Sequence, residues 1–433
     1  MALLICGLCT GHPLAFVLMS VGILVGFFAK GAACLPFFMN RLWGTMGSWE
    51  LLAVPLFLLM GNILSASGIA DNLFDSLHKL MGHVHGGIAV AVLLVSAVFA
   101  ACTGVIAASV ITMCILAMPV MLKMSYNKEL AAGTVMSGGT LGILIPPSIM
   151  LILFGTYSKV SVGKLFLAAV VPGLLLTVIY VIYVLLRCKM NPQDGPVISA
   201  EEMSNLPRRK IVGEALKNLI PPLLLIIGVL GSIIAGVATP TEAAALGAFV
   251  AMLMVVCYGR FEWKSFKNAV TDTANTTAMV LMIIIGASFF TGTFISIGGG
   301  DFVENLLLSF AGGNRWIVFL MMMFIVFLLG MLIDWIGIAM VCLPIFVPIA
   351  TRLGFDPLWF LMMVAINLQT SFLTPPFGYA IFYVKSVLPE GVMELNEIYR
   401  SVVPFIVLQL AGLILCIVFP SMVTWLPRMF IKF

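Results

Sequence analysis

Apolar residues fill this chain in long runs that are separated by short polar segments. A helix needs about twenty such residues to cross a bilayer. The alternating segments of about ten residues that are typical of a membrane β-barrel do not fit these longer runs. The pattern therefore predicts an all-α polytopic membrane protein with full spans at 12–29, 49–66, 163–187, 216–237, 240–258, 276–297 and 402–426.

Residues 87–122 and 316–351 depart from the single-span pattern. Each is long and apolar, with small or polar residues at its middle. We interpret each as a re-entrant helical hairpin, two helices that meet at a tip inside the membrane. The tips fall at Cys102, Thr103 and Gly104, and at Asp334, Trp335 and Gly337.

Two further segments, 130–155 and 357–384, each contain a Pro-Pro pair. Proline removes an amide donor and clashes with the preceding turn, so neither segment can be one continuous helix. Each is predicted to be a broken helix, interrupted at Pro146-Pro147 and at Pro375-Pro376.

Hairpin and broken helix occur twice in the same order, which indicates an internal repeat. An offset of 229 residues places Pro119 on Pro348 and Pro146-Pro147 on Pro375-Pro376. Five predicted crossings separate equivalent points of the two copies, and an odd number inverts the second copy. The predicted order is scaffold helices (1–47), repeat 1 (48–187), a cytoplasmic loop (188–215), scaffold helices (216–276), inverted repeat 2 (277–426) and a tail (427–433).

Composition supports a membrane protein. Hydrophobic residues make up 62% of the chain and charged residues only 9%, which excludes a soluble globular protein. The net charge of +4 includes no basic cluster large enough to favour a nucleic-acid partner. The nine cysteines lie almost entirely in apolar runs, so we expect no disulfide framework. We also expect the first apolar helix to be a retained span and not a signal peptide.

Basic residues set the expected orientation. Loop 188–215 carries Lys189, Arg208, Arg209 and Lys210, and loop 259–275 carries Arg260, Lys264 and Lys267. Both loops lie on the same predicted side, which the positive-inside rule makes cytoplasmic. The amino terminus is then inside, and the carboxy terminus and the open ends of the second hairpin are outside. Residues 70–85 and 300–313 are predicted to be short amphipathic helices at opposite interfaces.

Asp334 is an acidic residue inside a long apolar run, where charge is costly and often functional. Its carboxylate could bind a cation together with unwound backbone, or it could cap the helix that follows. Both readings stay open. For Thr239 and Glu242, in Thr-Pro-Thr-Glu, a capping box is the favoured interpretation.

Both broken helices carry polar residues at membrane depth. Unwound backbone is tolerated there only where it is buried or lines a cavity. Inverted repeats with paired broken helices are typical of secondary transporters whose site lies near the midplane. The candidate residues are Gly138, Thr140, Gly142 and Ser148 in the first break, and Gln369, Thr370, Ser371 and Thr374 in the second.

Other classes of membrane protein find less support in the sequence. Gly298 to Asp301 matches the GxGD of intramembrane aspartyl proteases, but no Tyr-Asp pair accompanies it. There is no H-E-x-x-H, and Gly163-Lys164 lacks a following Ser or Thr, so neither a zinc protease nor an ATPase is indicated. We therefore expect no enzyme, and channels more commonly gain symmetry by oligomerising.

Four motifs in order resemble the large membrane (M) subunit of TRAP transporters, the DctM or SiaM type. They are Ala-Thr-Pro-Thr-Glu-Ala-Ala-Ala (238–245), Gly-x-Leu-Ile-Pro-Pro-Ser (142–148), Asp-Trp-Ile-Gly (334–337) and Gln-Thr-Ser-Phe-Leu-Thr-Pro-Pro-Phe-Gly (369–378). The resemblance covers nearly the whole chain.

The resemblance implies Na⁺-coupled uptake of an organic anion, such as a carboxylate or a sialic-acid-like compound, by an elevator mechanism in a bacterial inner membrane. It implies two partners, a small four-helix membrane subunit (Q) and a soluble periplasmic substrate-binding protein (P). A self-sufficient sodium/carboxylate symporter is the alternative. The resemblance also implies two sodium sites and a substrate cavity. Carried onto this chain, the first sodium site would involve Thr103, Gly104, Gly138, Thr140 and Gly142, and the second would involve Asp334, Gln369, Thr370 and Thr374. The substrate cavity would involve Ser148, Ser371, Pro146, Pro147, Pro375 and Pro376.

Overall fold

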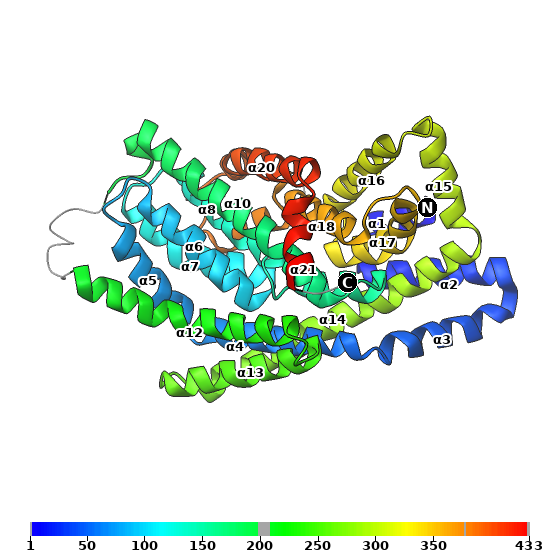
Figure 1. Ribbon diagram of the computed structural model, residues 1–433, viewed down its shortest axis with the longest axis horizontal. Coiled ribbons are helices and arrows are strands. Elements are labelled where there is room, and N and C mark those ends of the chain that lie inside the picture. Colours follow the sequence, from blue (N-terminus) through cyan, green and yellow to red (C-terminus); the bar gives the residue numbers. More distant parts are fainter. Residues whose placement is uncertain (1, 198–207, 376–377, 431–433) are drawn as a thin grey trace.

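The computed structural model describes residues 2–197, 208–375 and 378–430 (Figure 1). Every regular element within these ranges is a helix. Nine helices in the described part are long and apolar enough to cross a membrane. The prediction of an all-α polytopic membrane protein is confirmed.

One group of helices forms a scaffold, which runs along the lower edge of Figure 1. Helix α14 packs along α2 and α4, while α13 packs on α4 and against α12. Close approach depends on a glycine, since a Cβ on Gly22 of α2 would lie 2.7 Å from the backbone nitrogen of Phe290 in α14. The scaffold comprises α2 (Leu14–Lys30), α3 (Cys34–Met46), α4 (Ala53–Ala66), α12 (Arg208–Ile234), α13 (Pro240–Cys257) and α14 (Trp263–Ser296), with the short α1 (Ala2–Cys9) packed on α2.

The remaining long helices form a second group, named here the hairpin body. Its hairpins are α6 (Gly87–Thr103) with α7 (Ile106–Lys123), and α16 (Arg315–Gly330) with α17 (Trp335–Arg352). Its broken helices are α8 (Lys128–Thr140) with α9 (Ile149–Ser158), and α18 (Pro357–Leu373) with α19 (Tyr379–Val387). Helices α10 (Val162–Met190), α20 (Leu395–Val418) and α21 (Ser421–Phe430) complete it.

The core of the hairpin body is built on α8 and α18. Every residue of α8 from Leu130 to Thr140 and every residue of α18 from Leu358 to Leu373 is buried. Helix α8 is held between the two arms of its hairpin and α20. A helix buried on all sides carries no solvent or lipid face, which explains why polar residues on it must be satisfied internally.

Two short helices link the scaffold to the hairpin body. Helix α5 (Ile69–Met81) joins α4 to the first hairpin, and α15 (Gly299–Phe310) joins α14 to the second. Each follows a glycine with positive φ, Gly68 at 66° and Gly298 at 82°, which turns the chain sharply. They match the amphipathic helices expected at 70–85 and 300–313.

The element bounds repeat at the spacing that the sequence indicates. Helices α7 and α17 begin 229 residues apart, at Ile106 and Trp335, and so do α8 and α18, at Lys128 and Pro357. Each copy therefore contains one hairpin and one broken helix. The division into domains at the expected boundaries stays a prediction.

Three sequence-based expectations were wrong in detail. Residues 259–275 were expected as a loop, but α14 begins at Trp263, because its polar residues lie on an exposed face while Ala269 and Thr273 are buried. The span expected at 402–426 ends at Val418, and α21 begins separately at Ser421 after Pro420. Loop 188–215 is also shorter than expected, since α12 begins at Arg208. Residues 198–207 of that loop lie outside the described residues.

Candidate functional site

A cavity of about 190 Å³ lies where the two hairpin tips meet the scaffold. The first tip contributes Gly104 to Ala107, and the second contributes Asp334 to Ile336. Scaffold helices α4 and α14 form the opposite wall with Leu58, Thr276, Met279 and Val280. The cavity thus joins both repeats and both groups of helices.

Four helices begin at this cavity. Helices α7, α9, α17 and α19 start at Ile106, Ile149, Trp335 and Tyr379, and each of these first residues lines it. A helix amino terminus carries about half an elementary positive charge and points unpaired N–H groups outward. Breaking each hairpin and each long helix near its middle is what brings these four ends together.

The charged and polar groups in the wall are few. Asp334 is its one ionisable acid, and no lysine or arginine of the described chain lines it. Two phenols, Tyr379 and Tyr383, lie one helical turn apart on α19, and Thr276 adds a hydroxyl from α14. Asp334 is near enough to interact electrostatically with both phenols.

At the first tip, the chain turns at Gly104, whose φ of 62° favours glycine. The Thr103 hydroxyl shares a hydrogen bond with the Ser109 hydroxyl (2.8 Å). A Cβ on Gly104 would lie 3.3 Å from the Pro147 carbonyl oxygen, so the tip rests directly on the break in the first long helix. The structure therefore brings Thr103 and Gly104 to the Pro146-Pro147 segment.

The other residues expected at the first sodium site lie deeper along the hairpin. Gly138 packs against Ser96 of α6, whose hydroxyl is buried with no hydrogen-bond partner in the described chain. Gly142 packs against Ala100, and the Thr140 hydroxyl donates to the Ser137 carbonyl (2.9 Å). These residues line the contact between α8 and α6.

At the second tip, Asp334 is the N-cap of α17. Its carboxylate accepts a hydrogen bond from the backbone N–H of Ile336 (3.3 Å). Capping uses one oxygen, and the side chain still lines the cavity. The capping contact and an ion-binding role are therefore compatible.

The polar side chains near the end of α18 differ in whether they have hydrogen-bond partners. The Thr370 and Thr374 hydroxyls donate to carbonyls one turn earlier, at 3.3 and 2.8 Å. Gln369 is fully buried, and neither atom of its amide has a hydrogen-bond partner in the described part of the chain. A buried amide without partners is costly, which marks Gln369 as a candidate ligand. Within the described ranges, no hydrogen bond joins Gln369, Thr370 or Thr374 to Asp334.

The residues expected to line a substrate cavity lie beside this cavity and not in its wall. Ser148 is fully buried and its hydroxyl donates to the Ile143 carbonyl, while the Ser371 hydroxyl donates to carbonyls of Phe327 and Asn367. Pro146, Pro147 and Pro375 occupy the breaks, and Pro376 lies outside the described residues.

Sequence reasoning missed Tyr379, Tyr383 and Thr276. The two tyrosines follow the second Pro-Pro pair at a spacing of four, which places both on one face of any helix that resumes there. That spacing is a usable signal. The sequence held no such signal for Thr276, because its role depends on how α14 packs.

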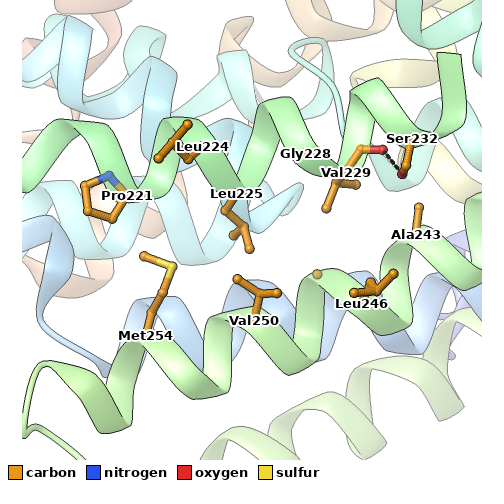
Figure 2. Close-up of a pocket in the computed structure, with 11 residues that line it drawn as sticks. Pro221, Leu224, Leu225, Gly228, Val229, Ser232, Ala243, Leu246, Val250 and Met254 are labelled. Carbon is orange, nitrogen blue, oxygen red and sulfur yellow. Dashed lines mark hydrogen bonds between the residues drawn. The ribbon is translucent and has the colours of Figure 1, made fainter. Parts of the chain in front are cut away.

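Thr239 and Glu242 lie on the scaffold and form a reciprocal capping box at the start of α13. The Thr239 N–H donates to Glu242 Oε2 (2.8 Å), and the Glu242 N–H donates to Thr239 Oγ1 (3.3 Å). Beyond this cap, α12 and α13 enclose an apolar groove of about 420 Å³ (Figure 2). Its hydroxyl, on Ser232, donates to the Val229 carbonyl (2.8 Å), so the groove offers no free polar group to an ion.

Residues 1–422 match the family described as "Tripartite ATP-independent periplasmic transporter, DctM component". The chain belongs to this family. Among similar DctM-family proteins is the C4-dicarboxylate TRAP transporter large permease protein DctM of Pseudomonas aeruginosa, which is 32% identical over 90% of this chain and 88% of its own length. The sialic acid TRAP transporter large permease protein SiaM of Vibrio cholerae is 28% identical over 100% of this chain and 98% of its own length.

A solved structure shares the fold. The YdaH transporter of Alcanivorax borkumensis, described as having an unusual topology, superimposes with a TM-score of 0.66 at 14% identity over 94% of this chain and 97% of its own. The family and the relatives identify a transporter large permease, a multi-pass membrane protein of the DctM family.

Proposed function

We propose that this chain moves a small organic anion, such as a carboxylate or a sialic-acid-like compound, across the bacterial inner membrane by coupling its uptake to Na⁺ entry. The cavity between the hairpin tips is the observation that carries the proposal. Its volume of about 190 Å³ suits a small carboxylate. Four helix amino termini give it positive potential without a basic side chain.

Sodium coupling draws support from the charge inside the cavity. An anion that enters it meets the Asp334 carboxylate, and two like charges at close range repel in a low-dielectric interior. A cation held by Asp334 would remove that repulsion, so that ion and anion bind better together than apart. The unpartnered amide of Gln369 is a further oxygen ligand of the type that a hard cation prefers.

The division into scaffold and hairpin body supports an elevator mechanism, in which the hairpin body carries the cavity past the scaffold. The contact between them uses small groups and few polar bonds. Gly61 of α4 packs on the backbone at Thr103, and the Thr291 hydroxyl of α14 donates to the Met340 carbonyl of α17 (3.0 Å). Helices α5 and α15 would serve as the connecting arms.

We expect two protein partners, a small membrane subunit and a soluble periplasmic binding protein. The cavity lacks a cationic clamp that could concentrate a dilute anion, which favours delivery by a separate protein. The basic residues near loop 188–215 favour a cytoplasmic amino terminus and a periplasmic carboxy terminus.

Reconstitution in proteoliposomes tests the proposal. The binding protein encoded near this chain is screened by thermal shift against small carboxylates and sialic acids to choose the labelled substrate. The chain with both partners should take up that substrate only under an inward Na⁺ gradient, and uptake should stop when the binding protein is left out. Saturable uptake without the binding protein would indicate a self-sufficient symporter, and currents that need no sodium gradient would indicate a channel.

A further inference from the structure

A second polar cavity, of about 290 Å³, lies far from the hairpin tips, where α16, α18 and α21 begin. We call it the arginine basin, because Arg315 and Arg428 both line it. Trp316, Phe355 and Trp359 form its aromatic wall, and Asp356 and Ser421 add polar groups. None of these residues lines the cavity between the hairpin tips.

The two guanidinium groups lack an anionic partner among the described residues. Arg315 lies 5.7 Å from the centroids of the Trp316 and Phe355 rings, a cation–π arrangement that holds it without neutralising it. The nearby acid Glu304 is already paired with Arg352. Asp356 caps α18, accepting hydrogen bonds from the N–H groups of Leu358 (2.8 Å) and Trp359 (3.4 Å).

Further donors face the same place. The Pro420 carbonyl accepts the first hydrogen bonds of α21, from the N–H groups of Val423 and Thr424. Neither the N–H nor the hydroxyl of Ser421 has a hydrogen-bond partner in the described ranges. Two guanidinium forks, one hydroxyl and one backbone N–H therefore surround a cavity with a net positive charge. Arginine forks match the oxygens of phosphate bidentately.

The surroundings of the basin indicate the membrane interface. The α20 span ends at Val418, immediately before it. Trp316 is 41% exposed and Trp425 of α21 is 57% exposed, and tryptophan is enriched at the level of lipid headgroups. Helix α21 also exposes Met429 and Phe430 while burying Val423 and Pro427, as expected of a helix that lies in the interface.

We propose that the arginine basin binds the phosphodiester group of a membrane lipid, with Arg315 and Arg428 as its principal ligands. The exposed aromatic and apolar side chains beside it contact the glycerol and acyl regions. A soluble protein carboxylate would make no use of that apolar flank. The basin is formed by the hairpin body alone, so the lipid belongs to that body in every position it takes.

Native mass spectrometry of the delipidated full chain, titrated with palmitoyl-oleoyl phosphatidylglycerol, tests this site. The double variant Arg315→Gln/Arg428→Gln should bind the first lipid at least about tenfold more weakly than the unmodified chain. The charge-matched control Arg400→Gln/Lys267→Gln changes two exposed residues elsewhere and should bind within about twofold of it. Arg315→Lys, which keeps the charge but loses the fork, should show an intermediate loss.

Two further measurements complete the test. Thermal unfolding must show that the double variant is folded, and Arg315→Lys supplies the milder variant if it is not. Glycerol 1-phosphate should displace the lipid only at far higher concentration than a second lipid does. Equal displacement by glycerol 1-phosphate and by lipid would assign the site to a free phosphate compound. Unchanged lipid affinity in the double variant would show that the two arginines do not bind lipid and would favour a protein carboxylate as their ligand. Either result overturns the proposal.

Discussion

Gly61 of scaffold helix α4 packs directly on the backbone of Thr103 at the tip of the first hairpin. A Cβ at Gly61 would lie 2.7 Å from the Thr103 Cα atom, closer than real side chains approach. The scaffold thus touches the tip through main chain and leaves no space there for a methyl group. Since Thr103 is also expected at the first sodium site, this contact joins the scaffold to the ion-binding region that we propose.

Replacing Gly61 with alanine should therefore disfavour this arrangement of the two bodies. Forcing a methyl group into a filled contact costs about 1–3 kcal/mol. We expect lower uptake and a lower unfolding temperature.

Gly231→Ala on α12 is the matched control, since nothing lies within 4 Å of its added Cβ. It should raise helix stability by up to about 1 kcal/mol and leave uptake unchanged. Equal behaviour of the two variants would contradict a tight contact at the tip.

Asp334→Asn separates ion binding from helix capping. Asparagine still accepts the hydrogen bond from Ile336, so expression and unfolding temperature should change little, by at most about 1 kcal/mol. Uptake should fall at least about tenfold, because bonds to a charged group contribute about 1.5–3 kcal/mol. Glu242→Gln removes a carboxylate from the capping box on the scaffold and should leave uptake intact. Unaltered sodium dependence in Asp334→Asn would reject the ion role.

Gln369 and Asn367 provide an internal comparison on α18. Both are buried, but the Asn367 amide donates to the Met323 carbonyl (2.7 Å) whereas the Gln369 amide is unpartnered among the described residues. In sodium-free buffer, Gln369→Leu should stabilise the protein and Asn367→Leu should destabilise it, each by about 1–3 kcal/mol. We expect sodium to raise the unfolding temperature of the unmodified chain. Of these two variants, only Gln369→Leu should abolish that rise. A preserved sodium response in that variant would exclude Gln369 as a ligand.

The expected orientation can be measured by cysteine labelling in a cysteine-free background. Gln193→Cys, in the loop after α10, should react only with reagents that reach the cytoplasm. Phe430→Cys, at the end of α21, should react from the outside. Labelling of both positions from one side would contradict the inverted arrangement of the repeats.

Proline and repeat spacing made much of the fold predictable. The Pro146-Pro147 pair breaks its helix between Thr140 and Ile149, and the same spacing predicts the break in the second copy, which lies between Leu373 and Tyr379. Proline acts locally, through its missing N–H, so its effect can be inferred without tertiary information.

Features that depend on packing were not predictable in the same way. The polar beginning of α14, with Lys264 and Lys267, has the composition of a loop, and only burial of Ala269 and Thr273 shows why it is helical. Likewise, the sequence indicated the hairpin tips, and with them Gly104, Asp334 and Trp335, but not the rest of the cavity wall. Ser148 points to a carbonyl while Tyr379 faces the cavity, a difference of side-chain direction that residue spacing does not encode.

The convergence of four helix amino termini has a consequence for how such a protein changes during evolution. The attraction for anions that we propose for this cavity resides in the peptide backbone, so no single substitution can delete it, and alanine scanning of the cavity would not detect it. Side chains such as Tyr379, Tyr383 and Thr276 are then free to vary with the shape of the cargo while the charge preference is inherited unchanged. Selection for new substrates should accordingly alter hydroxyls and rings in the wall and seldom introduce an arginine.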